Sequence, residues 1–194
     1  MLDHYKMLGI LEQYNPSWNI EFHEIQKQLL SELGGMPVNI QHVGSTSVPG
    51  VLAKPILDID IIINDRSLLR LISSRLKDLG YEPKGEQGVP GRFAFRQLNE
   101  FTPSTTFMKT WQPHHLYVCY ADSLALKNHL LFRDALRNDP DLANKYSELK
   151  QTILKSPGMS REQYTRKKTD FILSVLALQG IDKAELEIIR SADF

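Results

Sequence analysis

Apolar residues recur at helical spacing near the start of the chain and alternate with polar residues in its middle. The helical spacing predicts helices over 17–33 and 67–79. Ser17 is a candidate N-cap of the first helix, and Trp18 is expected to pack that helix onto a sheet. The expected apolar stripe of this helix is Ile20, Ile25, Leu29, Leu30 and Leu33. Alternation predicts strands over 38–43, 55–63, 81–83, 92–96 and 114–120.

The last third of the chain returns to helical spacing. It predicts four helices, over 123–137, 140–155, 161–179 and 182–191. Asp139-Pro140 and Ser156-Pro157-Gly158 mark breaks between helices, because proline disfavours a helical residue before it. The order of one helix, a strand-rich middle and a helical tail favours an α+β fold with a mixed sheet over a doubly wound parallel fold.

Length and composition suit one domain over 1–194, with 123–194 as its helical part. Hydrophobic residues make up 42% and charged residues 24%, as in ordinary soluble proteins. The formal net charge is zero, which disfavours non-specific binding to nucleic acid. The single cysteine, Cys119, excludes an internal disulfide and is expected to be a small buried residue. We see no signal peptide and no apolar stretch near the roughly 20 residues that span a bilayer, so we expect a cytoplasmic protein.

The strand over 55–63 carries two carboxylates, Asp58 and Asp60, two residues apart. Side chains alternate between the faces of a strand, so these two point to the same side. Neighbouring carboxylates repel, and a divalent cation would compensate them. Mg²⁺ is typically held by one or two carboxylates together with substrate phosphates. Asp58 and Asp60 are therefore candidate metal ligands and catalytic residues.

A turn of small residues, His42-Val43-Gly44-Ser45-Thr46-Ser47-Val48-Pro49-Gly50, precedes this strand. Its backbone N–H groups and hydroxyls can bind an anion. The candidate nucleotide-binding residues of this region are Gly44, Ser45, Thr46, Ser47 and Lys54. The turn does not have the spacing of a phosphate loop of the G-x-x-x-x-G-K-[ST] type, and Lys54 is followed by proline. An ordinary tight turn with glycines at positive φ is the alternative.

The turn and the strand together resemble a known signature. Val43-Gly44-Ser45 followed by Asp58-Ile59-Asp60-Ile61 resembles that of the nucleotidyltransferase superfamily, which includes DNA polymerase β-like enzymes. In that superfamily the Gly-Ser turn holds nucleotide phosphates and the two aspartates bind Mg²⁺. The resemblance implies the same roles for these residues here.

A closer resemblance covers most of the chain. The turn, with Ala53-Lys54-Pro55-Ile56-Leu57-Asp58, is similar to the hallmark of the GrpB-like family. Further segments that resemble this family are Tyr14-Asn15-Pro16-Ser17-Trp18, His114-His115-Leu116-Tyr117-Val118, Leu131-Phe132-Arg133-Asp134 with Leu136-Arg137, Tyr146 with Lys150, and Tyr164 with Lys168. The resemblance implies a nucleotidyltransferase-like fold with flanking helices. Some members of the family are fused to dephospho-CoA kinase.

One strand departs from the family pattern. Its usual His-Leu-His ending has Tyr117 in place of the second histidine, and tyrosine is a poor metal ligand near neutral pH. The superfamily's third carboxylate would be expected on this strand, and neither His115 nor Tyr117 supplies it. Either His115 takes that catalytic place, or the protein binds nucleotide without fast chemistry. An added imidazole moves the preference from Mg²⁺ towards Mn²⁺ or Zn²⁺.

Three arginines are further candidates for binding the nucleotide. Arg92 and Arg96 fall on one face of a strand and could contact phosphates, although a solvated strand face explains them equally well. The family pattern implies that Arg133 faces the site, although it could form a local ion pair with Asp134. The pair Lys167-Lys168 is expected on a solvated helix face.

The histidines have a structural alternative. A histidine at the end of a strand is often a polar residue with satisfied hydrogen bonds rather than a ligand, and this is the alternative for His42, His114 and His115.

These features predict a nucleotidyltransferase that binds a Mg-nucleoside triphosphate and transfers a nucleotidyl group to an unknown acceptor. The alternative is a catalytically inactive module that binds a nucleotide or a partner, linked to coenzyme A metabolism by analogy with the fusions. A nucleic-acid binder is disfavoured, because the chain has no net charge and no basic strand with interleaved aromatic residues. The expected partner is a nucleoside triphosphate or another phosphate-bearing small molecule, and no membrane.

Overall fold

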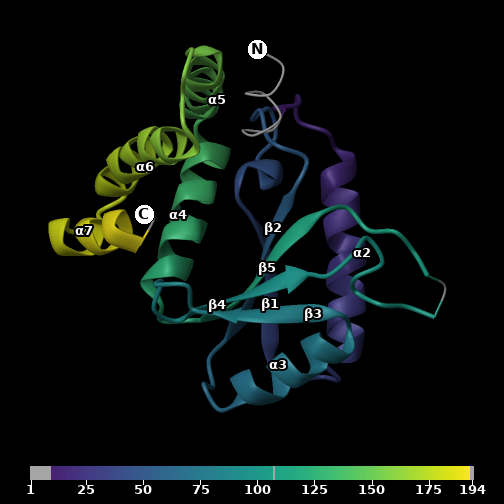
Figure 1. The fold of residues 1–194 in the computed structure, drawn as a ribbon. Coiled ribbons are helices and arrows are strands. Elements are labelled where there is room, and N and C mark those ends of the chain that lie inside the picture. The colour runs from purple at the N-terminus through teal and green to yellow at the C-terminus, as the bar shows by residue number, and fades with distance from the viewer. Residues whose placement is uncertain (1–9, 107, 193–194) are drawn as a thin grey trace.

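A five-stranded mixed sheet lies at the centre of a computed structural model that describes residues 10–106 and 108–192 (Figure 1). The strands are β1 (Val38–Val43), β2 (Leu57–Ile63), β3 (Tyr81–Gly85), β4 (Arg92–Gln97) and β5 (His114–Tyr120). They lie in the order β1-β2-β5-β4-β3. β2 pairs in parallel with β5, and the other neighbours are antiparallel. The predicted mixed sheet is confirmed.

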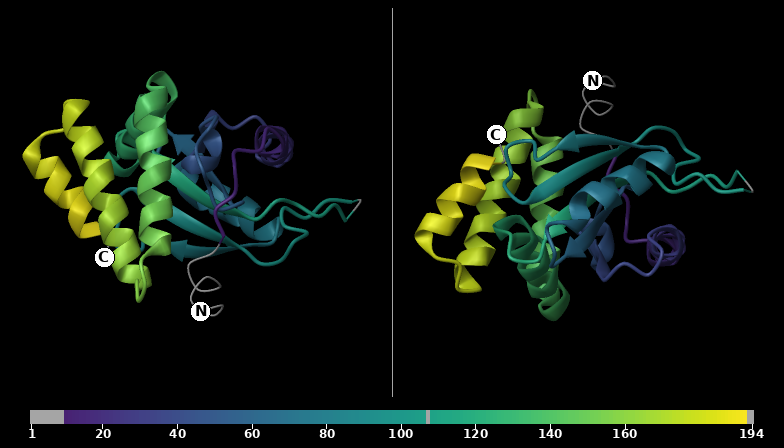
Figure 2. Two further views of the ribbon diagram at one scale, coloured as in Figure 1. Left: turned by 90° about the horizontal axis from the view of Figure 1, so that it is seen from above. Right: turned by 90° about the horizontal axis from the view of Figure 1, so that it is seen from below.

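Helices cover both faces of this sheet. One face carries α2 (Ser17–Glu32) and α3 (Leu68–Asp78). The other side carries α4 (Leu124–Asn138), α5 (Pro140–Lys155), α6 (Arg161–Leu178) and α7 (Lys183–Ala192) (Figures 1 and 2). Of these, α4 contacts β1 and β5, and α6 packs on α4, α5 and α7. The fold is α+β with a helical C-terminal part, as predicted. None of the described helices is long and apolar enough to cross a bilayer.

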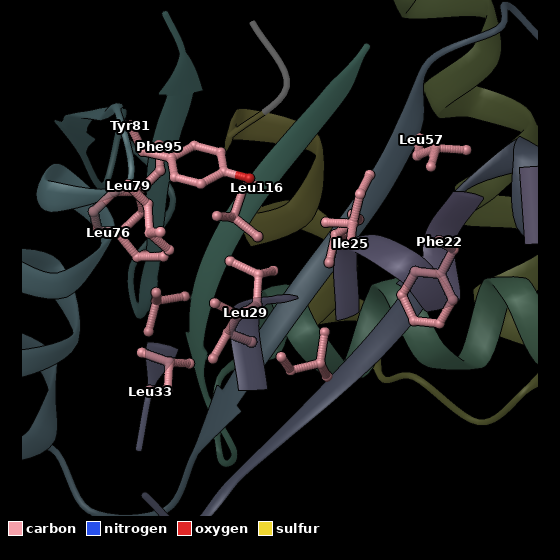
Figure 3. Close-up of a cluster of buried hydrophobic side chains, with 14 of the residues drawn as sticks. Phe22, Ile25, Leu29, Leu33, Leu57, Leu76, Leu79, Tyr81, Phe95 and Leu116 are labelled. Atoms are coloured by element: carbon pink, nitrogen blue, oxygen red, sulfur yellow. The ribbon is translucent and has the colours of Figure 1, made fainter. Parts of the chain in front are cut away.

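The main hydrophobic core lies between the sheet and the helices α2 and α3 (Figure 3). Alternation along β2 sends four apolar residues to this side, and all four are fully buried: Leu57, Ile59, Ile61 and Ile63. Complete burial of one such side chain contributes about 1.5–3 kcal/mol. Asp58 and Asp60 lie between these residues in the sequence and therefore point to the opposite face, towards α4 and α6.

The helices and strands begin and end within two residues of their predicted bounds, and Trp18 and Cys119 are buried as expected. Two predictions about α2 were wrong. Ser17 is the first helical residue rather than the cap, and Pro16 occupies the cap position. Ile20 is 62% exposed and Leu30 is 43% exposed, because both lie on the side of the helix turned away from the sheet.

Candidate functional site

The two aspartates share one face of β2 but differ in depth. The Asp58 side chain is 32% exposed, whereas that of Asp60 is fully buried. Asp58 lines two adjoining cavities above the sheet, and Asp60 is not among the described residues that line either one. The predicted common face is therefore confirmed, but of these two candidate metal ligands only Asp58 opens onto a cavity, because α4 covers Asp60.

Each carboxylate accepts a hydrogen bond from a histidine. His115 lies directly beside Asp58 in the parallel pairing of β5 with β2, and its Nδ1 donates to Asp58 Oδ1 over 2.9 Å. His129 reaches down from α4, and its Nδ1 donates to Asp60 Oδ2 over 2.8 Å. Burial lowers the pKa of His129, but the adjacent Asp60 carboxylate outweighs it, and the net pKa is raised above its usual value. The Asp60 carboxylate therefore favours the protonated form of His129.

The turn after β1 packs closely against the side chain of Asp58. Gly44 has φ +69° and ψ −172°, a region that is essentially restricted to glycine. A Cβ atom at this position would stand 2.1 Å from Asp58 Oδ2, so only glycine allows the turn to approach the carboxylate. The 3₁₀ helix Ser45–Ser47 follows directly and brings Ser45 to the edge of both cavities. The predicted juxtaposition of turn and carboxylate is present.

The other two hydroxyls of the turn hold it together. Ser47 Oγ donates to the carbonyl of Gly44 over 2.7 Å. Thr46 Oγ1 lies 3.0 Å from His42 Nε2, although Thr46 also lines one of the two cavities. Ser45 is thus the hydroxyl of this turn best placed to contact a ligand.

Lysines gather around the larger of the two cavities, which we call the lysine cavity and which has a volume of about 310 Å³. It is lined by Leu11, Ser45, Thr46, Ala53, Lys54, Ile56, Asp58, His115, Lys150, Tyr164, Thr165 and Lys168. Lys54 and Lys168 each lie near the ring of Tyr164, with Nζ 5.4 and 5.5 Å from its centroid. Three amino groups beside one serine and one carboxylate form a surface suited to a phosphate chain with a cation.

Lys150 is the most unusual of these lysines, because it is only 2% exposed. Its Nζ donates to Ser45 Oγ over 3.1 Å and also to the carbonyl of Leu52. Burial, reinforced by the nearby charge of Lys168, lowers the pKa of Lys150 to about 7. An anion in the cavity would favour the charged form of this amine.

The smaller cavity, which we call the inner cavity, has a volume of about 230 Å³. It is lined by Val43, Gly44, Ser45, Asp58, Tyr117, Asn128, His129, Phe132, Tyr146, Thr165, Lys168, Thr169 and Ile172. It shares Ser45, Asp58 and Lys168 with the lysine cavity. Tyr117 stands beside Asp60 in the strand register, and burial raises its pKa to about 12, so its hydroxyl stays protonated.

The structure does not bring the three predicted arginines to these cavities. Arg133 donates to Asp134 and to the carbonyl of His42, which fastens α4 to β1, and the predicted ion pair with Asp134 is present. Arg96 is paired with Glu82 of the neighbouring strand. Arg92 stacks its guanidinium 4.8 Å from the ring of Tyr117 and lines a third cavity. Their expected contacts with nucleotide phosphates are not supported by this geometry.

Two histidines have structural roles. His42 stacks on Phe22, and His114 lies 2.6 Å from the hydroxyl of Tyr81. Burial lowers the pKa of both imidazoles to about 4, so they stay neutral at physiological pH. The structural alternative is correct for His42 and His114, whereas His115 lines the lysine cavity beside Asp58.

The most important residues that the sequence reasoning missed are His129, Lys150 and Lys168. The expectation of a solvated face holds for Lys167, which is exposed, but was wrong for Lys168, which lines both cavities. For Lys150 and Lys168 the family resemblance held a signal, since both positions belong to its pattern. His129 had no comparable signal.

The oxygen donors of the site for a divalent cation are the carboxylates of Asp58 and Asp60. Asp58 is accessible, and Asp60 Oδ1 is shielded from solvent without a hydrogen-bond partner. A buried carboxylate oxygen in that state is costly unless a positive charge compensates it, and His129 supplies one such charge. Within residues 10–106 and 108–192, no group of three or more His, Cys, Asp or Glu side chains is arranged to hold a metal ion.

Comparison with known proteins identifies the family. The family model described as GrpB protein matches residues 10–178. The chain belongs to the GrpB family. It is 33% identical to the UPF0157 protein YqkA of Bacillus subtilis (strain 168) over 159 residues, which cover 82% of this chain and 43% of YqkA. The chain thus spans less than half the length of that relative.

Solved structures extend the comparison. The conserved protein GrpB from Enterococcus faecalis superimposes with a TM-score of 0.70 at 29% identity, covering 94% of this chain and 98% of that one. The Cid1 poly(U) polymerase bound to MgGTP superimposes with a TM-score of 0.52 at 16% identity, covering 89% of this chain and 53% of Cid1. At that identity the similarity shows a shared nucleotidyltransferase-like fold.

Proposed function

We propose that this GrpB-family protein binds a Mg-nucleoside triphosphate in the lysine cavity and transfers its nucleotidyl group to an acceptor. The observation that carries the proposal is the close approach of Gly44 to Asp58, beside a cavity that Asp58 lines together with Ser45 and three lysines. The fold shared with the MgGTP-bound Cid1 polymerase supports the same assignment.

The phosphate chain is proposed to lie along the lysines. Lys54, Lys150 and Lys168 would neutralise its charge, and Ser45 would donate a hydrogen bond to it. Asp58 would hold the cation, which supplies charge neutralisation of the phosphates when bound, and Asp60 would join it only where the Asp60–His129 pair opens. Mg²⁺ suits these oxygen donors, with Mn²⁺ as the alternative if His115 contributes its imidazole.

The reaction would be an in-line displacement at the α-phosphorus. The acceptor oxygen forms a bond to the α-phosphorus, the bond to the bridging oxygen breaks, and pyrophosphate leaves with that electron pair. Because His115 Nδ1 donates to Asp58, its Nε2 is the ring atom that can take the proton of the acceptor. Positioning and charge compensation would supply most of the rate enhancement.

A matched pair of neighbouring lysines tests nucleotide binding. Lys168 lines both cavities, whereas Lys167 is exposed. We expect Lys168→Gln to weaken Mg-ATP binding about tenfold or more, the loss typical of one charge-assisted hydrogen bond, and Lys167→Gln to leave it unchanged. Isothermal titration calorimetry measures both affinities.

Equal affinities in the two lysine variants would contradict the proposed position of the phosphates. The cation site has its own test, because the double variant Asp58→Asn with Asp60→Asn should lose the magnesium dependence of ATP binding. Binding that is unaffected by this double variant would refute the proposed cation site.

A second candidate function is nucleotide binding without transfer. The sealed Asp60–His129 pair and the tyrosine at position 117 favour it, because a second cation would lack a carboxylate ligand on β5. Measurement of pyrophosphate release over a panel of nucleoside triphosphates separates the two functions. Binding without release across the panel would favour the inactive module.

A further inference from the structure

A third cavity, which we call the α7 cavity, lies between the end of the sheet and helix α7. Its volume is about 440 Å³, within the usual size of small-molecule sites. Its buried apolar lining includes Val89, Ala125 and Ile189, none of which is more than 9% exposed. Such a lining suits a ring or a hydrocarbon chain.

This cavity adjoins the inner cavity. Asn128 and His129, neighbours on α4, line both of them. A molecule in the α7 cavity would therefore reach the same two residues, Asn128 and His129, as a molecule in the inner cavity. Two cavities that meet at one pair of residues are an arrangement in which two reactants can approach each other.

The charges that line the α7 cavity leave one arginine available for a ligand. Arg66 pairs with Asp122 over 2.8 Å and lies over the ring of Tyr120. Glu86 accepts a hydrogen bond from the backbone N–H of Gly91 over 2.8 Å. In contrast, Arg92 makes no ion pair with another described residue, although its guanidinium lies over the ring of Tyr117 and its Nε is shielded from solvent. A guanidinium without a carboxylate partner favours an anionic acceptor, because charge-assisted hydrogen bonds are the strongest.

We propose that the α7 cavity binds the acceptor of the transferred group, a small organic anion with an apolar ring or chain. Its carboxylate or phosphate would pair with Arg92, its apolar part would lie against Ala125 and Ile189, and its reactive oxygen would pass Asn128 towards the inner cavity. The inference rests on the proposed function, since it names the chemistry of the second substrate. It also gives Arg92 a ligand other than the nucleotide.

Three probes of similar size test the charge requirement: phenylacetate, phenyl phosphate and the neutral phenylacetamide. We expect the protein to bind the better of the two anions at least about tenfold more tightly than the amide, the difference typical of one charge-assisted hydrogen bond. The comparison of phenylacetate with phenyl phosphate shows which acid the site prefers. Equal binding of all three probes, or binding of none, would overturn the proposal.

Two arginines on the same strand face provide a matched pair of variants. Arg92→Gln should remove the preference for the anions, whereas Arg96→Gln should keep it, because Arg96 is paired with Glu82 outside the cavities. Ala125→Leu is a second variant, which adds bulk to the cavity lining, keeps the Arg92 side chain and should weaken the binding of all three probes. An unchanged anion preference in Arg92→Gln would overturn the proposal.

Titration of the same variants with Mg-ATP distinguishes this inference from the proposed function. If Arg92→Gln no longer binds the anions but still binds Mg-ATP, the acceptor site and the nucleotide site are both supported. If Arg92→Gln weakens Mg-ATP as much as the anions, the cavity belongs to the nucleotide and the acceptor site is refuted. If the anions bind through Arg92 but Mg-ATP does not bind to the unaltered protein, the nucleotide proposal fails and the assignment of an acceptor fails with it, leaving only an anion site.

Discussion

Replacement of Gly44 by alanine is expected to abolish Mg-ATP binding and to lower the free energy of unfolding. The backbone at Gly44 lies in a region that costs other residues roughly 1–3 kcal/mol. The added Cβ would also overlap Asp58 Oδ2, since the two atoms would be 2.1 Å apart, and overpacking of this kind costs about 1–3 kcal/mol more. Relief of the overlap must move either the turn or the carboxylate, and both belong to the proposed site. Urea unfolding and calorimetry measure the two effects.

Gly50 provides the matched control for this experiment. It lies in the same loop with φ +81°, and a Cβ there would meet no atom within 4 Å. Gly50→Ala should therefore show the backbone cost alone and keep Mg-ATP binding. If Gly44→Ala bound Mg-ATP as well as Gly50→Ala does, the close approach of turn and carboxylate would have no role in nucleotide binding.

Stability should rise with pH above neutrality because of Lys150. Burial, together with the charge of Lys168, lowers the pKa of this amine to about 7 in the folded protein. The unfolded chain, with a lysine pKa of about 10.4, binds the proton more tightly. Between these two pKa values the unfolded state carries more protons, so the free energy of unfolding increases with pH. From pH 7 to pH 9 the expected gain is about 2 kcal/mol.

Lys150→Met should lack this gain, because methionine does not titrate. Lys145 is an exposed residue of the same helix, and Lys145→Met should retain the full pH dependence. Urea unfolding at pH 7, 8 and 9 for the three proteins gives the comparison. Parallel pH profiles for the native protein and Lys150→Met would show that this amine keeps its charge when buried.

Local patterns predicted the fold well, because apolar residues alternate in each strand and recur at helical spacing in each helix. The alternation of Leu57, Ile59 and Ile61 with Asp58 and Asp60 specified both the strand and its apolar face. The family resemblance then indicated how the elements are arranged. The burial of Asp60 was not predictable in this way, because the pattern of β2 assigns Asp60 to a face of the sheet without showing that α4 covers it.

The candidate site was predicted only where its residues lie close together in the sequence. Gly44, Ser45 and Asp58 come from one turn and the strand after it, and all three line the inner cavity. Lys150 joins Ser45 across 105 positions of the chain, and a spacing argument cannot anticipate such a contact. The arginines were misplaced for a related reason, since a shared strand face does not tell which helices cover it.

The division of β2 between two faces also bears on how members of such a family can diverge. The side chains at odd positions from 57 to 63 fill the core, while those at 58 and 60 face the candidate site. In a library of every substitution along this strand, protein abundance should fall at odd positions and ligand affinity at 58 and 60. New specificities could thus accumulate on one side of a strand whose other side stays unchanged.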